Sequence, residues 1–339
     1  MMDSDMSRHL DDVVAALAAA DRVLVASHEN PDGDAIGSMS AAALALRGVG
    51  KQVRLYLHAD SPIPHEYAFL NLEGVERTLD HEASDGWTLL ALDCGNEARL
   101  GPDHVEMRAG FDRVIDVDHH HDNSRFGDVN YVDGHASSTA EILARVFDGL
   151  GVEITPAVAE ALYVGLVTDT GRFQYRTTSP AALRLAARLV EAGADVHRIF
   201  ELVFETQPMD KKRLLGRVLE HMQPYHGGHL LLSYVTRDDL QLVSGDEATT
   251  EGLIDDLREV EGVQVAALIR EQIPLPDGTI TPNRVSLRSR GSIDVSRIAR
   301  ASGGGGHKQA AGFSHPGTIE QIRDFIVDEV GSMLGESAA

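Results

Sequence analysis

The sequence predicts an α/β fold: an N-terminal, mostly parallel sheet with helices on both faces, a helical linker, and a smaller C-terminal α/β domain with a mixed sheet. Three observations predict it. Short apolar runs alternate with helical patterns through the first half, which is typical of βαβ units. The length of 339 residues exceeds what one hydrophobic core usually supports. After Gly193 two successive helical segments replace the alternation of strand and helix patterns, which indicates a second domain beyond them.

The first half contains four apolar runs that predict strands. Strands buried on both faces of a parallel sheet are nearly continuous runs of apolar residues. Such runs occupy 22–27, 52–57, 87–92 and 113–117. Segments rich in alanine and leucine predict the helices that cover this sheet, at 35–47, 138–150, 156–167 and 180–192.

Two helical segments separated near Pro208 predict a linker over 194–222, between a first domain at 1–193 and a second at 223–335. Between His226 and His229 the chain has two glycines, which favours a hairpin turn. Zinc is disfavoured there because no further ligand follows at metal-site spacing. The second domain has predicted strands at 229–235, 263–269 and 283–288, a glycine run at 303–306 and a terminal helix at 318–334.

The chain is strongly acidic. Its 53 Asp and Glu against 30 Lys and Arg give a net charge of −23, and only four of the basic residues are lysines. At molar salt the Debye length is only about 3 Å, so the self-repulsion of such a surface fades. We interpret the composition as halophilic, with an ordinary acidic protein of arginine-rich codon usage as the alternative. The charge therefore does not exclude a nucleic-acid ligand.

The sequence also predicts a cytoplasmic protein with no membrane partner. It has no apolar run of about 18 residues, the length expected of a membrane span. The N-terminus is acidic where a signal peptide is basic. The single cysteine, Cys94, fits a reducing compartment.

Histidines and aspartates gather where predicted strands end. His28, Asp93 and Asp118 each follow directly after a predicted strand. The carboxyl ends of parallel strands face a common crevice, so we expect these side chains to converge. Carboxylate oxygens and imidazole nitrogens bind divalent cations, and the pattern predicts a two-metal site. The six candidate ligands are His28, Asp32, Asp34, Asp93, His119 and Asp169.

Each motif has a structural alternative. Asp32 can be a turn residue and Asp34 a helix N-cap. Asp93 can be a solvated loop residue, although an unpaired carboxylate after an apolar strand is costly. Residues 118–121 can form a solvated histidine-rich turn, and Asp169 can be a polar helix end. The order of the four motifs favours the metal site over these alternatives.

The segments HENPDGD, LDCGN, DHHHDN and TDTGRF resemble, in this order, the four motifs of the DHH phosphoesterase superfamily. The later GGGGHKQAAG resembles the signature of its DHH-associated C-terminal domain. Within the superfamily the sequence is most similar to the compact nanoRNases, oligoribonucleases that also act as pAp phosphatases. RecJ exonucleases are typically longer, and the basic SRK-type motif of the family's pyrophosphatases is not found here.

This resemblance implies two cations that share Asp93 as a bridging ligand. It implies Mn²⁺ at both positions, with Mg²⁺ or Co²⁺ as possible substitutes. One cation would be held by His28, Asp32 and Asp93, and the other by Asp34, Asp93, His119 and Asp169.

The resemblance also assigns the catalytic residues, His120 and Asp93. His120 would lie against the scissile phosphate and either protonate the leaving oxygen or stabilise charge in the transition state. The third histidine, His121, leaves the register open. A shift by one residue would make His120 the ligand and His121 the catalytic group.

The predicted substrate-binding residues are Arg288, Gly305, Gly306, His307 and Ser138. The glycine run would let backbone N–H groups approach a phosphate, beside His307, although a flexible loop has the same pattern. The Arg288 guanidinium is suited to bidentate contact with phosphate. Ser138 would contact phosphate or, equally well, cap a helix.

Taken together, the sequence predicts a metal-dependent phosphodiesterase that hydrolyses short oligoribonucleotides to mononucleotides and also acts on pAp. Alternative substrates are pApA, cyclic di-AMP and, in a RecJ-like enzyme, single-stranded DNA. A function of a different class is a catalytically inactive nucleotide-binding regulator, which the complete ligand set disfavours. The expected partners are short RNA or a dinucleotide, and we allow for a homodimer.

The halophilic interpretation predicts that removal of KCl strongly lowers the melting temperature, because self-repulsion of the acidic surface is then unscreened. Thermal melts across a KCl series test this, with equal ionic strength from a second salt as the control. An unchanged melting temperature would leave the ordinary acidic protein as the explanation.

Overall fold

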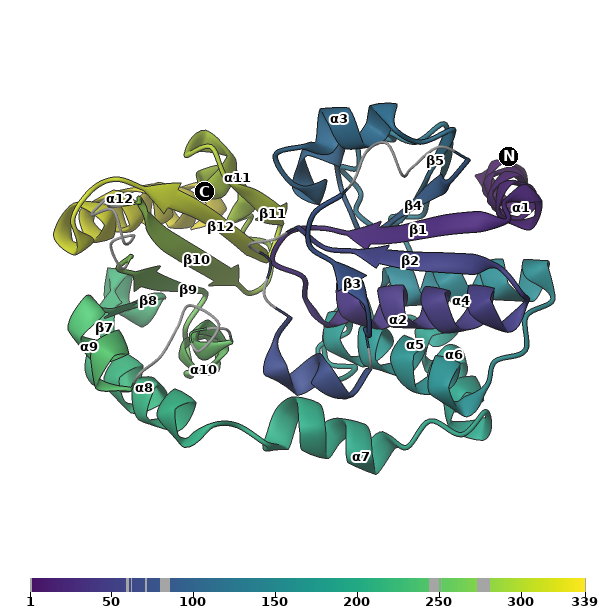
Figure 1. The fold of residues 1–339 in the computed structure, drawn as a ribbon. Helices are drawn as coiled ribbons and strands as arrows, with labels where there is room; N and C mark the ends of the chain where they lie inside the picture. The colour runs from purple at the N-terminus through teal and green to yellow at the C-terminus, as the bar shows by residue number, and fades with distance from the viewer. Residues whose placement is uncertain are drawn as a thin grey trace. The chain divides into compact units, whose positions relative to one another are not determined.

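The computed structural model describes residues 2–58, 61, 63–70, 72–79, 86–243, 250, 252–272 and 281–338. It divides into two compact units, Met1–Thr206 and Gln207–Ala339. Each unit is a sheet covered by helices (Figure 1), which confirms the predicted fold class. The predicted domain boundaries at 193 and 222 stay predictions. None of the described helices is long and apolar enough to cross a membrane.

The sheet of the first unit has six strands, all parallel, in the order β3-β2-β1-β4-β5-β6. The order reverses between β1 and β4, and ligands of such sheets bind at this switch point. The four longer predicted strands are present, whereas β3 and β6 were not predicted because they are too short to leave a pattern. The strands are β1 (Arg22–Ser27), β2 (Gln52–Tyr56), β3 (Val75–Glu76), β4 (Thr88–Leu92), β5 (Arg113–Asp118) and β6 (Val129–Val132).

Helices cover both faces of this sheet, as predicted. Val23 and Val25 of β1 face the larger hydrophobic cluster, whereas Leu24 and Ala26 face a smaller cluster that includes Met107. Figure 1 shows α2, α4, α5 and α6 on one side and α3 on the other. The helices are α1 (Met2–Ala19), α2 (Gly33–Gly48), α3 (His104–Ala109), α4 (Thr139–Leu150), α5 (Pro156–Asp169), α6 (Pro180–Glu191) and α7 (Val196–Phe200), with 3₁₀ turns η1 (His65–Leu70) and η3 (Glu97–Leu100) and a π-helical turn η4 (Glu201–Glu205).

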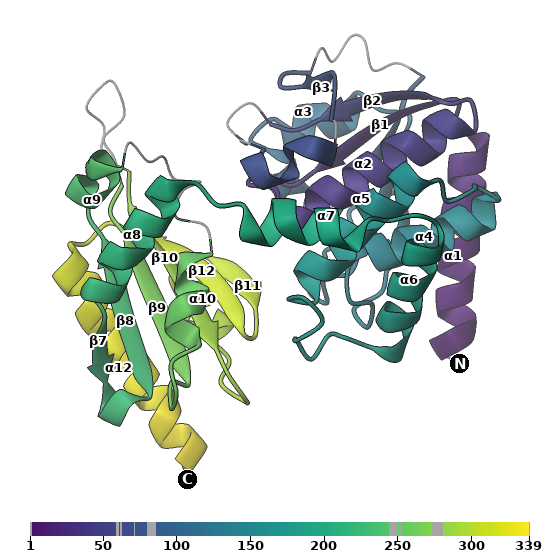
Figure 2. The same ribbon diagram turned by 90° about the horizontal axis from the view of Figure 1, so that it is seen from below.

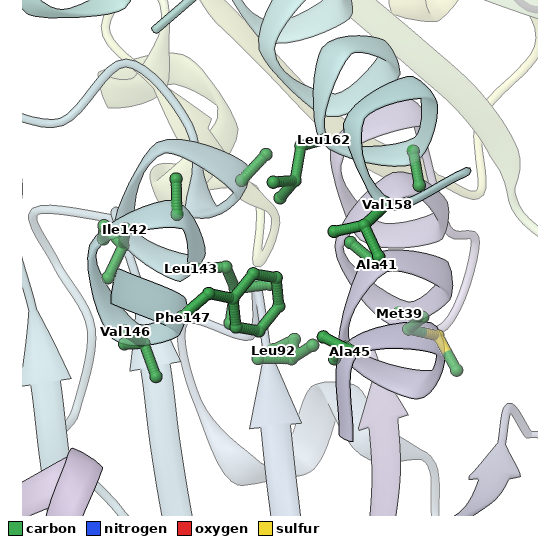
Figure 3. Packing of buried hydrophobic residues seen from close by; sticks show 14 of the residues in the cluster. Met39, Ala41, Ala45, Leu92, Ile142, Leu143, Val146, Phe147, Val158 and Leu162 are labelled. Atoms are coloured by element: carbon green, nitrogen blue, oxygen red, sulfur yellow. The ribbon is translucent and has the colours of Figure 1, made fainter. Parts of the chain in front are cut away.

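The end of β4 is anchored in the larger cluster. Leu92, its last residue, is fully buried beneath α2, α4 and α5 (Figure 3). Phe147 of α4 and Leu162 of α5 pack in the same cluster. To this cluster α2 contributes the small side chains of Ala41 and Ala45. The residue that follows Leu92 is therefore held in a fixed place at the carboxyl edge of the sheet.

Glycines allow α2 and α5 to touch backbone to backbone. A Cβ on Gly37 would lie 2.6 Å from the carbonyl oxygen of Ala161, and one on Gly165 would lie 2.6 Å from Oδ1 of Asp34. Since contacts this short are not tolerated, both positions require glycine. The approach places Asp34, in the first turn of α2, beside the C-terminal half of α5.

The second unit has a mixed sheet in the order β11-β12-β10-β9-β8-β7, in which β8 and β9 are parallel and the other pairs antiparallel. Ile322 and Ile326 of α12 cover one face, and Leu214 of α8 packs with α9 and α10 on the other (Figure 2). The strands are β7 (Gln223–Tyr225), β8 (Leu230–Val235), β9 (Val265–Arg270), β10 (Asn283–Ser289), β11 (Gly305–His307) and β12 (Ala310–His315), and the helices are α8 (Met209–Glu220), α9 (Arg237–Leu242), α10 (Leu253–Arg258), α11 (Ser296–Ala301) and α12 (Ile319–Ala338).

The two histidines near the start of this unit lie in a hairpin, as predicted. A 3₁₀ turn, His226–Gly228, joins the antiparallel strands β7 and β8. Gly227 has φ of 68°, a left-handed conformation that glycine adopts at no steric cost.

The α2–α5 contact yields a stability prediction. We expect Gly37→Ala to lower the free energy of unfolding by about 1–3 kcal/mol, because the new methyl group meets backbone atoms that have no room to move. Gly48→Ala is the matched control in the same helix, since nothing lies within 4 Å of a Cβ there. Urea denaturation of both variants tests the prediction, and equal stabilities would contradict it.

Candidate metal centre

The six predicted ligands come from five places, namely three strand ends at the carboxyl edge of the first sheet and the ends of two helices. His28 follows β1, Asp93 follows β4 and His119 follows β5, while Asp169 is the last residue of α5. The remaining two, Asp32 and Asp34, lie at the start of α2. Asp32 is exposed and the Asp169 side chain is 27% exposed, whereas His28, Asp34, Asp93 and His119 are buried.

The structure brings these side chains together in two groups. Ligand atoms of His28, Asp32 and Asp93 lie within 4.8 Å of one another, and so do those of Asp34, His119 and Asp169.

Asp93 lies between the two groups. Its Oδ2 is 3.6 Å from Nε2 of His28, and its Oδ1 is 3.5 Å from Nε2 of His119. The same His119 nitrogen is 3.1 Å from Oδ2 of Asp169. The two carboxylate oxygens of Asp93 thus face different imidazoles, which is the arrangement that a bridging ligand needs.

The backbone at Asp93 is unusual. Its φ of 57° is in the left-handed region, which few residues other than glycine occupy and which is often found at functional sites. Its N–H still donates to the carbonyl of Val117 in β5, at 3.1 Å. The left-handed turn thus comes directly at the strand end, where the side chain faces His28 and His119.

The acidic cluster is electrostatically unbalanced. Burial, followed by the charges of Asp93 and Asp169, raises the pKa of Asp34 well above its usual value. Burial and the charges of Asp32 and Asp93 likewise raise the pKa of Asp169. A divalent cation would supply the missing positive charge, and the mixed carboxylate and imidazole donors fit such an ion.

Three histidines keep Asp93 ionised, and a backbone carbonyl orients one of them, His28. Burial raises the pKa of Asp93, but the neighbouring imidazoles of His28, His120 and His119 outweigh it, and the pKa is lowered. Nδ1 of His28 lies 2.8 Å from the carbonyl oxygen of Glu29. Because Nδ1 faces this carbonyl, Nε2 is the nitrogen directed towards Asp93.

His120 forms a pair with Asp118 beside this cluster. Its Nδ1 lies 2.7 Å from Oδ1 of Asp118, and Asn123 donates to Oδ2 of the same carboxylate at 2.7 Å. Burial lowers the pKa of His120, but the hydrogen bond to Asp118 and the charge of Asp93 raise it to about 10. The imidazole is therefore held protonated with its other nitrogen, Nε2, unengaged by Asp118.

The structure bears on two alternatives that the sequence left open, the cap of α2 and the register of the histidines. Asp32, and not Asp34, caps α2, because its Oδ1 accepts from the N–H groups of Asp34 and Ala35. A carboxylate has a second oxygen, so capping leaves Asp32 able to bind a cation. His119 lies in the cluster and His121 is exposed, which favours the register with His119 as the ligand.

Both units of the chain match known families. A family model described as the DHH family, N-terminal domain, matches residues 22–166, and a DHHA1 domain model matches residues 240–335. The bifunctional oligoribonuclease and PAP phosphatase NrnA of Thermus thermophilus is 34% identical over 313 residues, which cover 92% of this chain and 90% of that protein. The chain belongs to the DHH family.

Two further similarities span most of the chain. The protein of the same name from Bacillus subtilis is 25% identical over 89% of this chain and 92% of its own length. The crystal structure of an exopolyphosphatase-related protein from Bacteroides fragilis has a TM-score of 0.85 at 24% identity, covers 96% of both chains, and shows the same fold. As a DHH-family protein the chain is a phosphoesterase, an enzyme class that uses divalent metals.

In the DHHA1 domain, the glycine run is part of a hairpin. Gly305 and Gly306 begin β11, which pairs with β12 at the edge of the sheet, and His307 ends it. Gly306 has φ of 127°, and a Cβ there would lie 2.5 Å from the carbonyl oxygen of Ala310. The glycines thus serve the tight hairpin, and a role in phosphate binding stays a prediction.

The other two predicted substrate residues have structural partners. Nε of Arg288 lies 3.6 Å from Oδ1 of Asp255, and its side chain is 28% exposed. Ser138 is fully buried and caps α4 by accepting from the N–H of Glu141 at 3.1 Å. For Ser138 the helix-cap alternative describes the observed contact, and its contact with substrate stays a prediction.

Residues that orient the ligands were not predicted from the sequence. Asn123 holds Asp118, and Nη2 of Arg99 lies 3.1 Å from Nδ1 of His28. Neither shows in a strand or helix periodicity, because both act from loops or short turns. The only available signal for Asn123 was its position three residues after His120 in a polar loop.

The raised pKa of Asp169 predicts a stability change in the metal-free enzyme. When folding raises the pKa of a carboxyl, the protein loses stability as the pH rises through that pKa, because the folded state disfavours the charged carboxylate. In EDTA we therefore expect Asp169→Asn to raise the melting temperature at neutral pH. The gain should shrink as pH falls towards the usual range of aspartic acid, where wild-type Asp169 is itself neutral.

Melting curves in EDTA across a pH series test this prediction. Asp148→Asn is the matched control, because Asp148 is an exposed residue paired with Arg188. Equal melting temperatures for the wild type and Asp169→Asn at every pH would contradict it.

Proposed function

We propose that this DHH phosphoesterase binds two divalent cations, Mn²⁺ at both positions, and hydrolyses short oligoribonucleotides to mononucleotides. Dephosphorylation of pAp is the proposed second activity. The observation that carries the proposal is the position of Asp93, with one oxygen towards His28 and the other towards His119. His28, Asp32 and Asp93 would hold one cation, and Asp34, Asp93, His119 and Asp169 the other.

The choice of cation follows from the donor set. Carboxylates suit Mg²⁺ and Mn²⁺, whereas the two imidazoles shift the preference from Mg²⁺ towards transition metals, so Mn²⁺ suits the mixture. Mg²⁺ and Co²⁺ are the proposed substitutes. When bound, the cations supply Lewis acidity that lowers the pKa of water and neutralises charge on the phosphate.

His120 is the proposed proton donor. Its side chain is 16% exposed and Asp118 holds it through Nδ1, and in this proposal Nε2 is the atom that faces the substrate. Asp118 fixes the ring and stabilises its charged form, as the raised pKa of His120 indicates. His120 would then protonate the leaving oxygen or stabilise negative charge as the ester bond breaks.

The proposed substrate class rests on the relatives. Proteins named as oligoribonuclease and PAP phosphatase match this chain over most of both lengths. In the DHHA1 domain we propose His307, Gly305, Gly306 and Arg288 as contacts of the substrate phosphate. A cytoplasmic location and a homodimer are further proposals.

A Mn²⁺-dependent assay at high salt tests the substrate class. The panel contains dinucleotide, pentanucleotide and long RNA, pAp, pApA, cyclic di-AMP, pyrophosphate and single-stranded DNA. We expect the highest kcat/KM with the shortest RNAs, and measurable release of phosphate from pAp. Preference for cyclic di-AMP, pApA or single-stranded DNA would support the corresponding alternative. No hydrolysis of any substrate would point to a regulatory nucleotide-binding protein.

Asp93 provides the test of the bridging role. We expect Asp93→Ala to abolish turnover and Mn²⁺ binding while the far-UV circular dichroism is retained, because both cations lose a ligand. Asp93→Asn is a second variant, since asparagine tolerates the left-handed backbone better than alanine. Asp148→Ala is the surface control. Retained turnover in both Asp93 variants would refute the bridging role.

A further inference from the structure

We propose that Thr139 is a positioning residue that orients Asp34 and Asp93 together, and that Arg145 holds the loop that places Thr139. This inference rests on the proposed two-cation site and adds to it a determinant of cation affinity. Nothing in the sequence pattern marks Arg145 as functional, because it lies in the middle of α4.

Thr139 donates to both carboxylates at once. Its backbone N–H donates to Oδ2 of Asp34 at 2.6 Å, and its hydroxyl donates to Oδ1 of Asp93 at 3.0 Å. The next N–H, of Ala140, donates to Oδ1 of Asp34 at 3.0 Å. Thr139 is fully buried, so water does not replace these donors. A single residue therefore connects a ligand of one proposed cation to the carboxylate shared by both.

The N-terminus of α4 is suited to this role. The first N–H groups of a helix have no partner within the helix, and the helix dipole favours negative charge there. Two of these groups, on Thr139 and Ala140, are directed at Asp34. The donors fix the plane of its carboxylate and offset part of the repulsion from its acidic neighbours.

Helix capping does not account for the Thr139 hydroxyl. Ser138 is the N-cap of α4 and already accepts from the N–H of Glu141. The Thr139 hydroxyl instead points out of the helix and donates to Asp93, which is 46 residues away in the sequence. Its partner lies in the acidic cluster, which indicates a role in that cluster.

Arg145 holds the loop that precedes Thr139. Its Nη1 donates to Oδ2 of Asp133 at 2.7 Å, and its Nη2 donates to Oε1 of Glu141 at 2.5 Å. The other oxygen of Glu141 accepts from the N–H and the hydroxyl of Ser137, at 2.9 and 2.6 Å. The guanidinium thus ties Asp133 to α4 and holds Glu141, the α4 residue that binds Ser137 at the other end of the loop. Loss of Arg145 would free the loop and with it the position of Thr139.

The test compares Thr139→Val, which keeps the shape and removes the hydroxyl, with Thr139→Ser, which keeps the hydroxyl. Mn²⁺ binding is measured by calorimetry on the full chain, and melting curves in EDTA report the metal-free fold. We expect Thr139→Val to weaken Mn²⁺ binding about 10- to 100-fold, as other groups that orient metal ligands do, and Thr139→Ser to restore it. Both variants should remain folded in EDTA.

Arg145→Met is compared with Arg188→Met. Arg188 also pairs with a carboxylate of α4, Asp148, but at the other end of the helix. We expect Arg145→Met to weaken Mn²⁺ binding and Arg188→Met to leave it unchanged. If both variants lower the melting temperature equally and bind Mn²⁺ as the wild type does, Arg145 has only a structural role and the inference about it is wrong.

The outcomes separate this inference from the proposed function. Wild-type binding and hydrolysis with unchanged affinity in Thr139→Val would overturn the inference alone. Equal loss in Thr139→Val and Thr139→Ser would also overturn it, because packing and not the hydroxyl would then matter. Absence of Mn²⁺ binding by the wild type would overturn both.

Discussion

Four aspartates share one small volume at the carboxyl edge of the first sheet, and the repulsion between their charges is the constraint on which the site depends. Burial makes the repulsion stronger, because little water is present to screen it. The result is seen in the raised pKa values of Asp34 and Asp169. Nearby histidines and N–H groups offset part of this cost, and bound cations would offset the rest.

The fold sustains this arrangement through close packing far into the core. The glycines of α2 and α5 let Asp34 approach the end of α5, and Leu92 anchors the strand end that carries Asp93. The first turn of α4 then supplies donors to both carboxylates. Each of these features costs stability or restricts the sequence, as is common where function requires like charges to lie together.

Much of this could be predicted from the sequence, because strand ends in a parallel sheet all face one crevice. That rule predicts that His28, Asp93 and His119 converge, and they do, whereas Asp169 was predicted from the order of the motifs and the resemblance, since it ends a helix that follows no strand. Short strands such as β3 were missed because two residues show no periodicity. The structural alternative to the metal site made Asp34 the N-cap of α2, whereas Asp32 caps the helix, a shift that the sequence pattern does not resolve.

The positioning residues could not be predicted for a different reason. Thr139 and Asn123 act through contacts over long sequence separations or across loops, and their chemistry is that of ordinary capping and turn residues.

Anomalous diffraction from a crystal grown with Mn²⁺ tests the central claim most directly. The account predicts two manganese peaks on either side of the Asp93 carboxylate, with His28 on one and His119 on the other. A single manganese peak away from Asp93, or no peak at all in a crystal grown with excess Mn²⁺, would contradict the account.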